Sequence, residues 1–275
     1  MNLIVISELF PPEETSTAYI MGEITKTLSD KYNVTIVCGP EVYDQNKLTV
    51  LPKSSLIAGV TTIRVKGIKE NKANKLSRIR KFLLMSWRLY KASKKVINKG
   101  DKVLLVSNPF PLLILMAFHR KKMDYEISFL AHDLFPEPLL MRFKLPNLVY
   151  RQCLNIFNRS YARMDKIISL GRDMTDVLRE KTMPYNPNLE IIQIENWGDI
   201  NSIYPMDTHS DSDKITIEYA GNMGKSQKLD ALIEIFSKAN NKDLYLDFWG
   251  TGEQESYLKE KAQSVSNISF HGPYA

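Results

Sequence analysis

Short apolar runs alternate with longer segments of helical periodicity along most of the chain. Apolar residues in short runs or at every second position predict strands, and apolar residues three and four apart predict helices. The expected strands are Asn2–Ser7, Val34–Val37, Val60–Val65, Lys102–Ser107, Glu126–Ala131, Lys166–Ser169, Glu190–Ile194, Ile215–Ala220, Leu244–Trp249 and Ile268–Phe270. The expected helices are Thr17–Asp30, Asn74–Asn98, Pro111–Arg120, Leu148–Met164, Arg172–Lys181, Lys228–Lys238 and Glu253–Ser264.

This alternation favours a parallel sheet that is covered by helices on both faces. The polar run from Asn201 to Lys214 contains Pro205, lacks apolar periodicity and therefore predicts a linker. The predicted fold class is α/β. A complete Rossmann-like domain would cover residues 1–200, and residues 201–275 would hold the linker and the first part of a second Rossmann-like domain.

Composition narrows the class of protein. Of the 275 residues, 44% are hydrophobic and 25% are charged, which is typical of a folded globular protein and argues against disorder. The two cysteines and four histidines are widely spaced, so neither a disulfide framework nor a metal site is expected. No signal peptide is recognisable, and the longest apolar stretch, Phe110–Phe118, is about half of the roughly 20 residues that a spanning helix needs. We expect a cytoplasmic protein.

Positive charge is concentrated in one segment. Between Arg64 and Lys102 there are 14 Lys and Arg residues and two acidic residues, within a chain whose net charge is +6. Together with Leu83, Leu84 and Trp87, these cations favour contact with an anionic membrane surface. The alternative is a helix whose apolar stripe lies in the core and whose lysines are only solvated. A nucleic-acid partner is not expected, because no binding motif accompanies the charge.

Loops that follow strands are the candidate ligand sites, because ligands of open α/β sheets bind at the carboxyl ends of the strands. In the first such loop, Glu14, Thr15 and Ser16 precede a helix, where hydroxyl groups and free N–H groups suit a sugar or an anion; simple N-capping is the alternative. His132 and Asp133 directly follow a buried strand. They are placed to bind sugar hydroxyls or to polarise a reacting group, or else they only order a turn.

Two glycine-rich turns follow strands of the second predicted domain. The first contains Gly221, Asn222, Gly224, Lys225 and Lys228, which could offer backbone N–H groups and positive charge to a diphosphate. A plain tight turn with solvated lysines is the alternative. The second turn contains Gly250 and Gly252, and both turns should lie at one edge of the sheet. Asn196 lies near the predicted boundary between the two domains. It would be part of either an interdomain cleft or a hinge.

Six segments together resemble the retaining family-4-like glycosyltransferases of GT-B fold, of the type that builds bacterial surface polysaccharides. These segments occur in the family's order and spread over nearly the whole chain. They are Phe10–Glu13, Asn33–Val37, Ala131–Glu137, Glu195–Asp199, Ala220–Gly224 and Gly250–Gly252.

The resemblance implies two Rossmann-like domains that face each other across a cleft, with the acceptor on the N-terminal side and the donor mainly on the C-terminal side. A hexose or N-acetylhexosamine would pass from a nucleotide sugar, with UDP favoured, to a lipid-linked saccharide, with retention and without a metal or cofactor. His132 and Asp133 would be catalytic, and Glu14, Thr15 and Ser16 would lie on the acceptor side. The donor would be bound by Asn196, Gly221, Asn222, Gly224, Lys225, Lys228, Gly250 and Gly252.

The chain departs from the family pattern in several places. Asn222 stands where many members carry an arginine, and Thr15-Ser16 replaces the usual paired glycines. The family's two glutamates seven residues apart would lie beyond residue 275, so we expect the donor domain to be incomplete. A catalytically incomplete acceptor- or membrane-binding remnant and a nucleotide-sugar epimerase of the same fold are the alternatives. The expected location is the inner face of the plasma membrane, as a peripheral protein.

Overall fold

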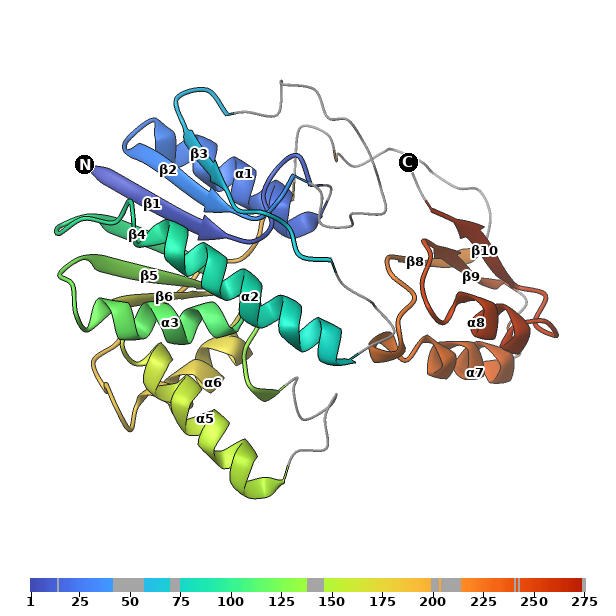
Figure 1. The fold of residues 1–275 in the computed structure, drawn as a ribbon. Helices are drawn as coiled ribbons and strands as arrows, with labels where there is room; N and C mark the ends of the chain where they lie inside the picture. The colour runs from blue at the N-terminus through green and yellow to red at the C-terminus, as the bar shows by residue number, and fades with distance from the viewer. Residues whose placement is uncertain are drawn as a thin grey trace. The chain divides into compact units, whose positions relative to one another are not determined.

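The computed structural model describes residues 1–13, 15–41, 57–69, 75–137, 146–198, 203, 214–239, 241 and 243–273 (Figure 1). The chain divides into two compact units, Met1–Gly198 and Asp199–Ala275, with the division two residues before the predicted boundary. Most of the predicted linker, residues 201, 202 and 204–213, lies outside the described residues, as does Glu14.

The first unit is built on a parallel sheet of seven strands. The strands are β1 (Asn2–Ser7), β2 (Asn33–Cys38), β3 (Thr61–Arg64), β4 (Lys102–Val106), β5 (Glu126–Ala131), β6 (Lys166–Ser169) and β7 (Glu190–Gln193). Their order in the sheet is β3-β2-β1-β4-β5-β6-β7. The strand order therefore reverses between β1 and β4, and such a switch point opens a crevice at the carboxyl ends of the strands.

Helices cover both faces of this sheet. They are α1 (Ser16–Ser29), α2 (Lys75–Ser93), α3 (Pro111–Arg120), α5 (Asn147–Tyr161) and α6 (Arg172–Thr182). Helices α2, α3 and α5 lie side by side on one face, where Met85, Met116 and Phe157 join the larger core cluster (Figure 1). On the other face α1 contributes Met21 to a second cluster with residues of β1, β2, β4 and β5. Each face of the sheet thus buries its own apolar layer.

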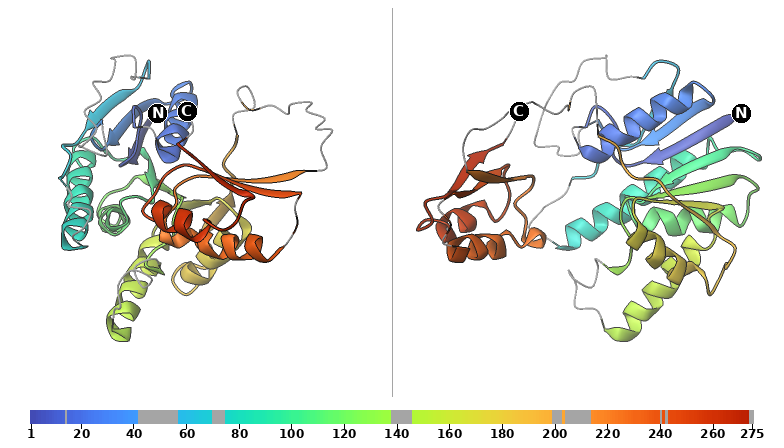
Figure 2. Two further views of the ribbon diagram at one scale, coloured as in Figure 1. Left: turned by 90° about the vertical axis from the view of Figure 1, so that its right-hand side faces the viewer. Right: turned by 180° about the vertical axis from the view of Figure 1, so that it is seen from behind.

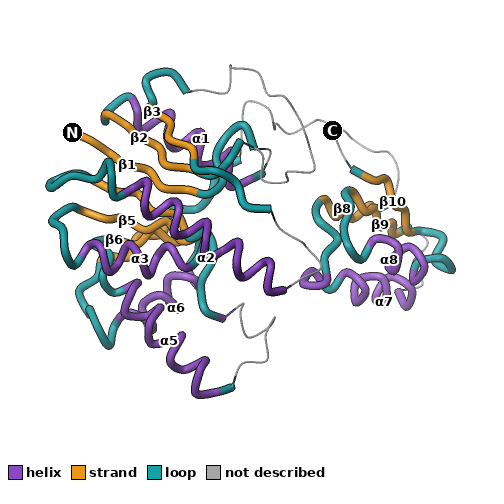
Figure 3. Tube along the Cα trace, in the orientation of Figure 1, coloured by secondary structure: helices purple, strands orange, loops and turns teal. Residues whose placement is uncertain are grey.

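The second unit is smaller and repeats the same pattern. Strands β8 (Ile215–Ala220), β9 (Leu244–Trp249) and β10 (Ile268–Gly272) form a parallel sheet in the order β10-β9-β8. Helices α7 (Leu229–Ala239) and α8 (Glu255–Lys261) pack on one face of it (Figures 2 and 3). Ile233, Phe236, Leu246, Phe248 and Leu258 are buried between the helices and the sheet.

Helix ends differ most from the prediction. Helix α2 ends at Ser93, five residues before the predicted Asn98. The backbone turns there so that Ile97 enters the core with 2% exposure, and Asp101 then accepts a hydrogen bond from the backbone N–H of Asn98 at 2.7 Å. Tertiary burial of one apolar side chain thus overrides the helical propensity of the basic run. None of the helices in the described ranges is long and apolar enough to cross a membrane.

Candidate functional site

The loop after β5 is attached to the end of the neighbouring strand β4. The hydroxyl of Ser107 accepts hydrogen bonds from the backbone N–H groups of both His132 and Asp133, each at 3.2 Å. Ser107 is 3% exposed, and its own backbone N–H donates to the carbonyl of Leu130 at 3.1 Å. These contacts place His132 at the carboxyl edge of the sheet, one strand away from the switch point.

Two helices hold the rest of the same loop. The phenol oxygen of Tyr161 in α5 accepts a hydrogen bond from the backbone N–H of Phe135 at 3.0 Å. The ring of Phe135 stacks on Phe110, with 4.7 Å between centroids. At the end of the loop Glu137 pairs with Lys181 of α6, whose side chain is 6% exposed. The loop is therefore anchored by side chains from three elements, which limits the motion of the His132 backbone.

The imidazole of His132 has an unused hydrogen-bonding position. Its Nε2 atom is buried and has no hydrogen-bond partner among the described residues. Burial lowers the pKa of His132, and the nearby Asp133 carboxylate opposes this only in part. The ring is thus neutral at neutral pH, and Nε2 can accept or donate a hydrogen bond according to the tautomer. A ligand hydroxyl is a suitable partner. Asp133 itself is exposed.

The loop between β1 and α1 forms a shallow hollow. Thr15 caps α1, because its side-chain oxygen accepts from the backbone N–H of Ala18 at 3.2 Å. The capping interpretation of this hydroxyl is therefore confirmed, whereas the side chain of Ser16 is exposed. Both residues border a hollow of about 440 Å³ that is lined by Pro11, Pro12, Glu13, Thr15, Ser16 and Tyr19. This hollow is large enough for part of a sugar.

Arg64, at the end of β3, supports that loop. Its guanidinium donates to the backbone carbonyl of Pro11 and, at 3.5 Å, to that of Gly39. These contacts join the carboxyl ends of β2 and β3 to the loop after β1. Arg64, Ser107, Tyr161 and Lys181 were not among the residues predicted for the site. For Ser107 a signal existed, because it is a small hydroxyl residue at a strand end, but its partners are more than twenty residues away.

The two glycine-rich turns of the second unit pack directly on each other. The backbone N–H of Gly221 donates to the carbonyl of Trp249, and that of Met223 donates to Thr251, both at 2.9 Å. A Cβ atom at Gly250, whose φ is +120°, would lie 2.1 Å from the carbonyl oxygen of Gly221. These turns therefore lie at one edge of the sheet, as predicted, and glycine is required there for close backbone packing.

Of the lysines of the first turn, Lys225 begins a short 3₁₀ segment, Lys225–Gln227, and Lys228 directly follows this segment. Helix α7 begins at Leu229, one residue after the predicted start at Lys228. Lys228 instead adopts the left-handed conformation, with φ 50° and ψ 39°, which is uncommon for a residue with a side chain. Both lysines are exposed, as is Asn222, whose carbonyl accepts from the phenol of Tyr219 at 2.9 Å. Gly224 is buried behind them.

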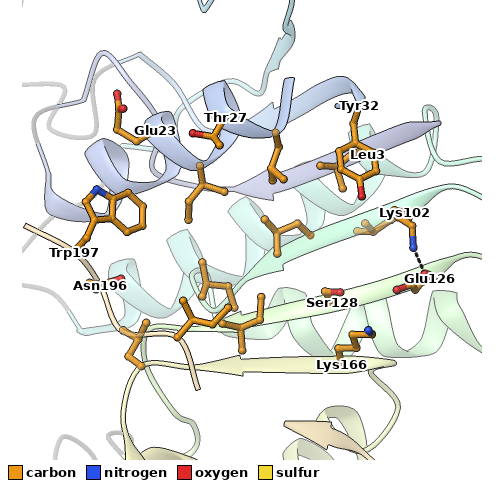
Figure 4. Close-up of a pocket in the computed structure, with 18 of the residues that line it drawn as sticks. Leu3, Glu23, Thr27, Tyr32, Lys102, Glu126, Ser128, Lys166, Asn196 and Trp197 are labelled. Atoms are coloured by element: carbon orange, nitrogen blue, oxygen red, sulfur yellow. Dashed lines mark hydrogen bonds and ion pairs between the residues drawn. The ribbon is translucent and has the colours of Figure 1, made fainter. Parts of the chain in front are cut away.

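Asn196 belongs to the first unit and lines a different hollow. This hollow, of about 700 Å³, lies on the α1 face of the sheet over β1, β4, β5 and β6 (Figure 4). Its floor is mostly apolar, and Trp197 closes one end near Glu23 of α1 (Figure 4). The structure thus places Asn196 on the face of the sheet. Its predicted role toward a donor stays a prediction.

Within the described ranges, no three His, Cys, Asp or Glu side chains form a group that could hold a metal ion. The groups available for a ligand are therefore the His132 imidazole and the hydroxyls near the first loop in the first unit, and the glycine turns with Lys225 and Lys228 in the second. Backbone N–H groups and lysines of this kind suit a phosphate, and the imidazole suits a hydroxyl.

Comparisons with known proteins agree with this arrangement of elements. No family model matches the chain. A probable glycosyltransferase, WbjE of Pseudomonas aeruginosa, is 23% identical over 275 residues, which cover 95% of this chain and 66% of WbjE. The apo form of the lipopolysaccharide outer core galactosyltransferase WaaB matches 100% of this chain and 69% of its own, with a TM-score of 0.60 and 12% identity.

Anabaena HepE, solved in complex with UDP, also matches 100% of this chain and 70% of its own, with a TM-score of 0.62 and 12% identity. At such identities the structural likeness defines the fold. The fold is that of the GT-B glycosyltransferases, and the predicted α/β, GT-B-like class is confirmed. The chain spans about two thirds of the length of WbjE.

Proposed function

We propose that this chain is a glycosyltransferase that moves a hexose or N-acetylhexosamine from a nucleotide sugar, with UDP as the favoured nucleotide, to a lipid-linked saccharide. We further propose that transfer retains the anomeric configuration and proceeds without a metal. The observation that carries the proposal is His132, which is held at the carboxyl edge of the sheet with a buried, unpaired ring nitrogen. The fold, the name of WbjE and the UDP in the HepE structure support it.

The proposed reaction requires that negative charge on the departing diphosphate be stabilised. The bond between the anomeric carbon and a diphosphate oxygen breaks, and its electron pair goes to that oxygen. The acceptor hydroxyl oxygen bonds to the same carbon, and its proton passes to the released diphosphate. Fixed N–H groups and cations must stabilise the charge that develops on the diphosphate. We assign Lys225 and Lys228 to it as the cations, and we assign Gly221, Gly224, Gly250 and Gly252 to the shape of the two turns beside them, because the backbone N–H groups of Gly221, Gly224 and Gly250 already donate within the protein.

Residues of the first unit would handle the sugars. A neutral His132 can hydrogen-bond a hydroxyl of the transferred sugar through Nε2, and the exposed carboxylate of Asp133 can bind a second hydroxyl. Thr15 and Ser16 would contact the acceptor at the hollow beside the first loop. Asn196 would contact the donor. Surface polysaccharide synthesis is the process that we infer from the lipid-linked acceptor.

The test is an activity screen of the full chain against a panel of nucleotide sugars, each with and without saccharide acceptors. His132→Ala and Lys228→Ala should each lower transfer at least a hundredfold, as expected for loss of a group that stabilises the transition state. Lys238→Ala is the matched control, because Lys238 is also exposed but lies at the far end of α7. Undiminished turnover in both variants would show that His132 and Lys228 are not part of the transferase site. Isomerisation of the donor without an acceptor would instead identify an epimerase.

A further inference from the structure

Helix α2 turns a largely apolar face away from the core. Its buried side includes Met85 and Leu89, which join the larger core cluster. The apolar stripe predicted from the sequence includes Leu76, Leu83 and Trp87, and these residues face away from the core. Leu76 is 74% exposed, Leu83 55% and Trp87 47%. The alternative in which this stripe packs in the core is therefore wrong for Leu76, Leu83 and Trp87, whereas Tyr90, the next residue of the predicted stripe, does pack against the core. Ile79 and Leu84 extend the same exposed surface, at 38% and 41%.

Positive charge continues this surface toward the end of the helix. From Lys75 to Gly100 the sequence has nine Lys and Arg residues and no acidic residue. Lys91, Lys94 and Lys95 follow Trp87 at helical spacing, and all three are exposed. The ammonium group of Lys91 lies 5.7 Å from the centre of the Trp87 ring. Among the described residues, no acidic side chain forms an ion pair with these three lysines.

A basic hollow opens beside Trp87. Its volume is about 650 Å³, and it is lined by Val65, Lys66, Trp87, Arg88, Tyr90, Lys91, Ala92, Lys94 and Lys95. Arg88 binds the backbone carbonyls of Lys66 and Gly67 at 2.7 and 2.9 Å, which holds the chain after β3 against α2. The hollow thus has a rigid wall and several cations around it. A phosphate group would be attracted to it.

Helix α5 also exposes apolar side chains, namely Leu148, Val149 and Ile156. In α5 the aromatic residues Phe157 and Tyr161 are 4% and 0% exposed and belong to the core. The combination of an exposed apolar stripe with a basic hollow is therefore found on α2.

We propose that the outer face of α2 docks on an anionic lipid leaflet. Leu76, Ile79, Leu83, Leu84 and Trp87 would enter the interface between head groups and acyl chains, as in amphipathic helices that lie on membranes. The hollow at Lys91, Lys94 and Lys95 would receive a lipid phosphate. Excess positive charge next to exposed apolar side chains complements an anionic membrane better than it complements a protein or a nucleic acid. Such docking would bring the proposed transferase to a lipid-linked acceptor, and in this respect the inference rests on the proposed function.

The surface is tested by co-sedimentation of the full chain with vesicles of phosphatidylcholine, either alone or with phosphatidylglycerol. Binding should need the anionic lipid and should weaken as salt is raised. The triple variant Lys91→Glu, Lys94→Glu, Lys95→Glu should bind at least tenfold more weakly, and Leu83→Ser with Trp87→Ser at least threefold. Matched controls are Lys26→Glu with Lys31→Glu, which are exposed on and just after α1, and Ile235→Ser, which is 63% exposed on α7. The controls should bind like the original chain.

Four results would overturn the inference. The first is equal binding of the α2 variants and the controls, and the second is binding that is independent of phosphatidylglycerol. The third is a dimer in sedimentation velocity that the Leu83 and Trp87 substitutions convert to a monomer, because a second copy would then cover the surface. Inorganic phosphate that binds as tightly as the vesicles would also contradict lipid docking. None of these measurements needs turnover, so they are independent of the transferase assay.

Discussion

The hydroxyl of Ser107 accepts a hydrogen bond from the backbone N–H of His132 at 3.2 Å, across the gap between two neighbouring strands. The same oxygen accepts from the backbone N–H of Asp133, so one side chain directly after β4 positions both residues that we assign to the sugar. A site whose backbone is held in this way needs little rearrangement when a ligand binds, which favours catalysis.

Ser107→Ala should therefore impair both stability and function. It leaves two backbone N–H groups without their acceptor in a partly buried position, at a cost of about 1–3 kcal/mol in the free energy of unfolding. Urea denaturation measures this cost, and transfer activity should fall with a larger effect on kcat than on KM. Ser93→Ala is the control, because Ser93 is fully buried and its hydroxyl has no hydrogen-bond partner among the described residues. Equal losses in both variants would contradict the anchoring role of Ser107.

Gly250→Ala should disrupt the second unit. The new Cβ would lie 2.1 Å from the backbone oxygen of Gly221, and neither backbone can move without breaking the hydrogen bonds between the two turns. We expect a loss of about 3 kcal/mol or more in the free energy of unfolding. Gly59→Ala measures the cost of backbone strain without a steric clash, because Gly59 has a φ of +77° but open space around its Cβ position. It should lose only about 1–2 kcal/mol. Thermal unfolding of both variants compares the two costs.

Stability should depend on pH through His132. Burial holds the pKa of His132 below its ordinary value of 6.5, so the unfolded chain binds a proton more readily than the folded chain. This contribution to stability is complete above pH 6.5 and is lost as the pH falls below that value. His132→Gln should therefore reduce the difference in unfolding free energy between pH 7.5 and pH 5. Some dependence will remain, because burial also lowers the pKa of His119. An unchanged difference would show that His132 is not desolvated.

Lys181→Ala should release the end of the His132 loop. It removes the partner of Glu137 at a site where the lysine is only 6% exposed, and one carboxylate oxygen of Glu137 is buried and has no hydrogen-bond partner among the described residues. A cost of about 1–2 kcal/mol in unfolding free energy is expected. The control is Lys166→Ala, which removes an exposed pair with Glu190 and should change stability little, as is usual for surface ion pairs. Chemical denaturation at low and high salt distinguishes the two, since salt should screen only the exposed pair.

Much of the fold could be predicted from periodicity. The strands β1, β5, β6, β8 and β9 have the predicted bounds, because short runs rich in apolar and β-branched residues are typical of strands. Errors fall at helix ends, such as Ser93 and Leu229: α2 ends where the backbone turns to bury Ile97 in the core, and α7 begins directly after Lys228, which has a left-handed backbone conformation. Neither effect leaves a local signal.

The sequence by itself determined the alternation of strands and helices, and it placed His132 and the glycine turns at the carboxyl ends of their strands, because local spacing reports which segments are buried. Only the tertiary structure decided that Ser107, Tyr161 and Lys181 hold the His132 loop, since these contacts join residues more than twenty positions apart. It also decided the orientation of α2. That helix has apolar residues on two sides, and the pattern alone could not tell which side packs against the sheet; the packing of Met85 and Leu89 against α3 and the strands does.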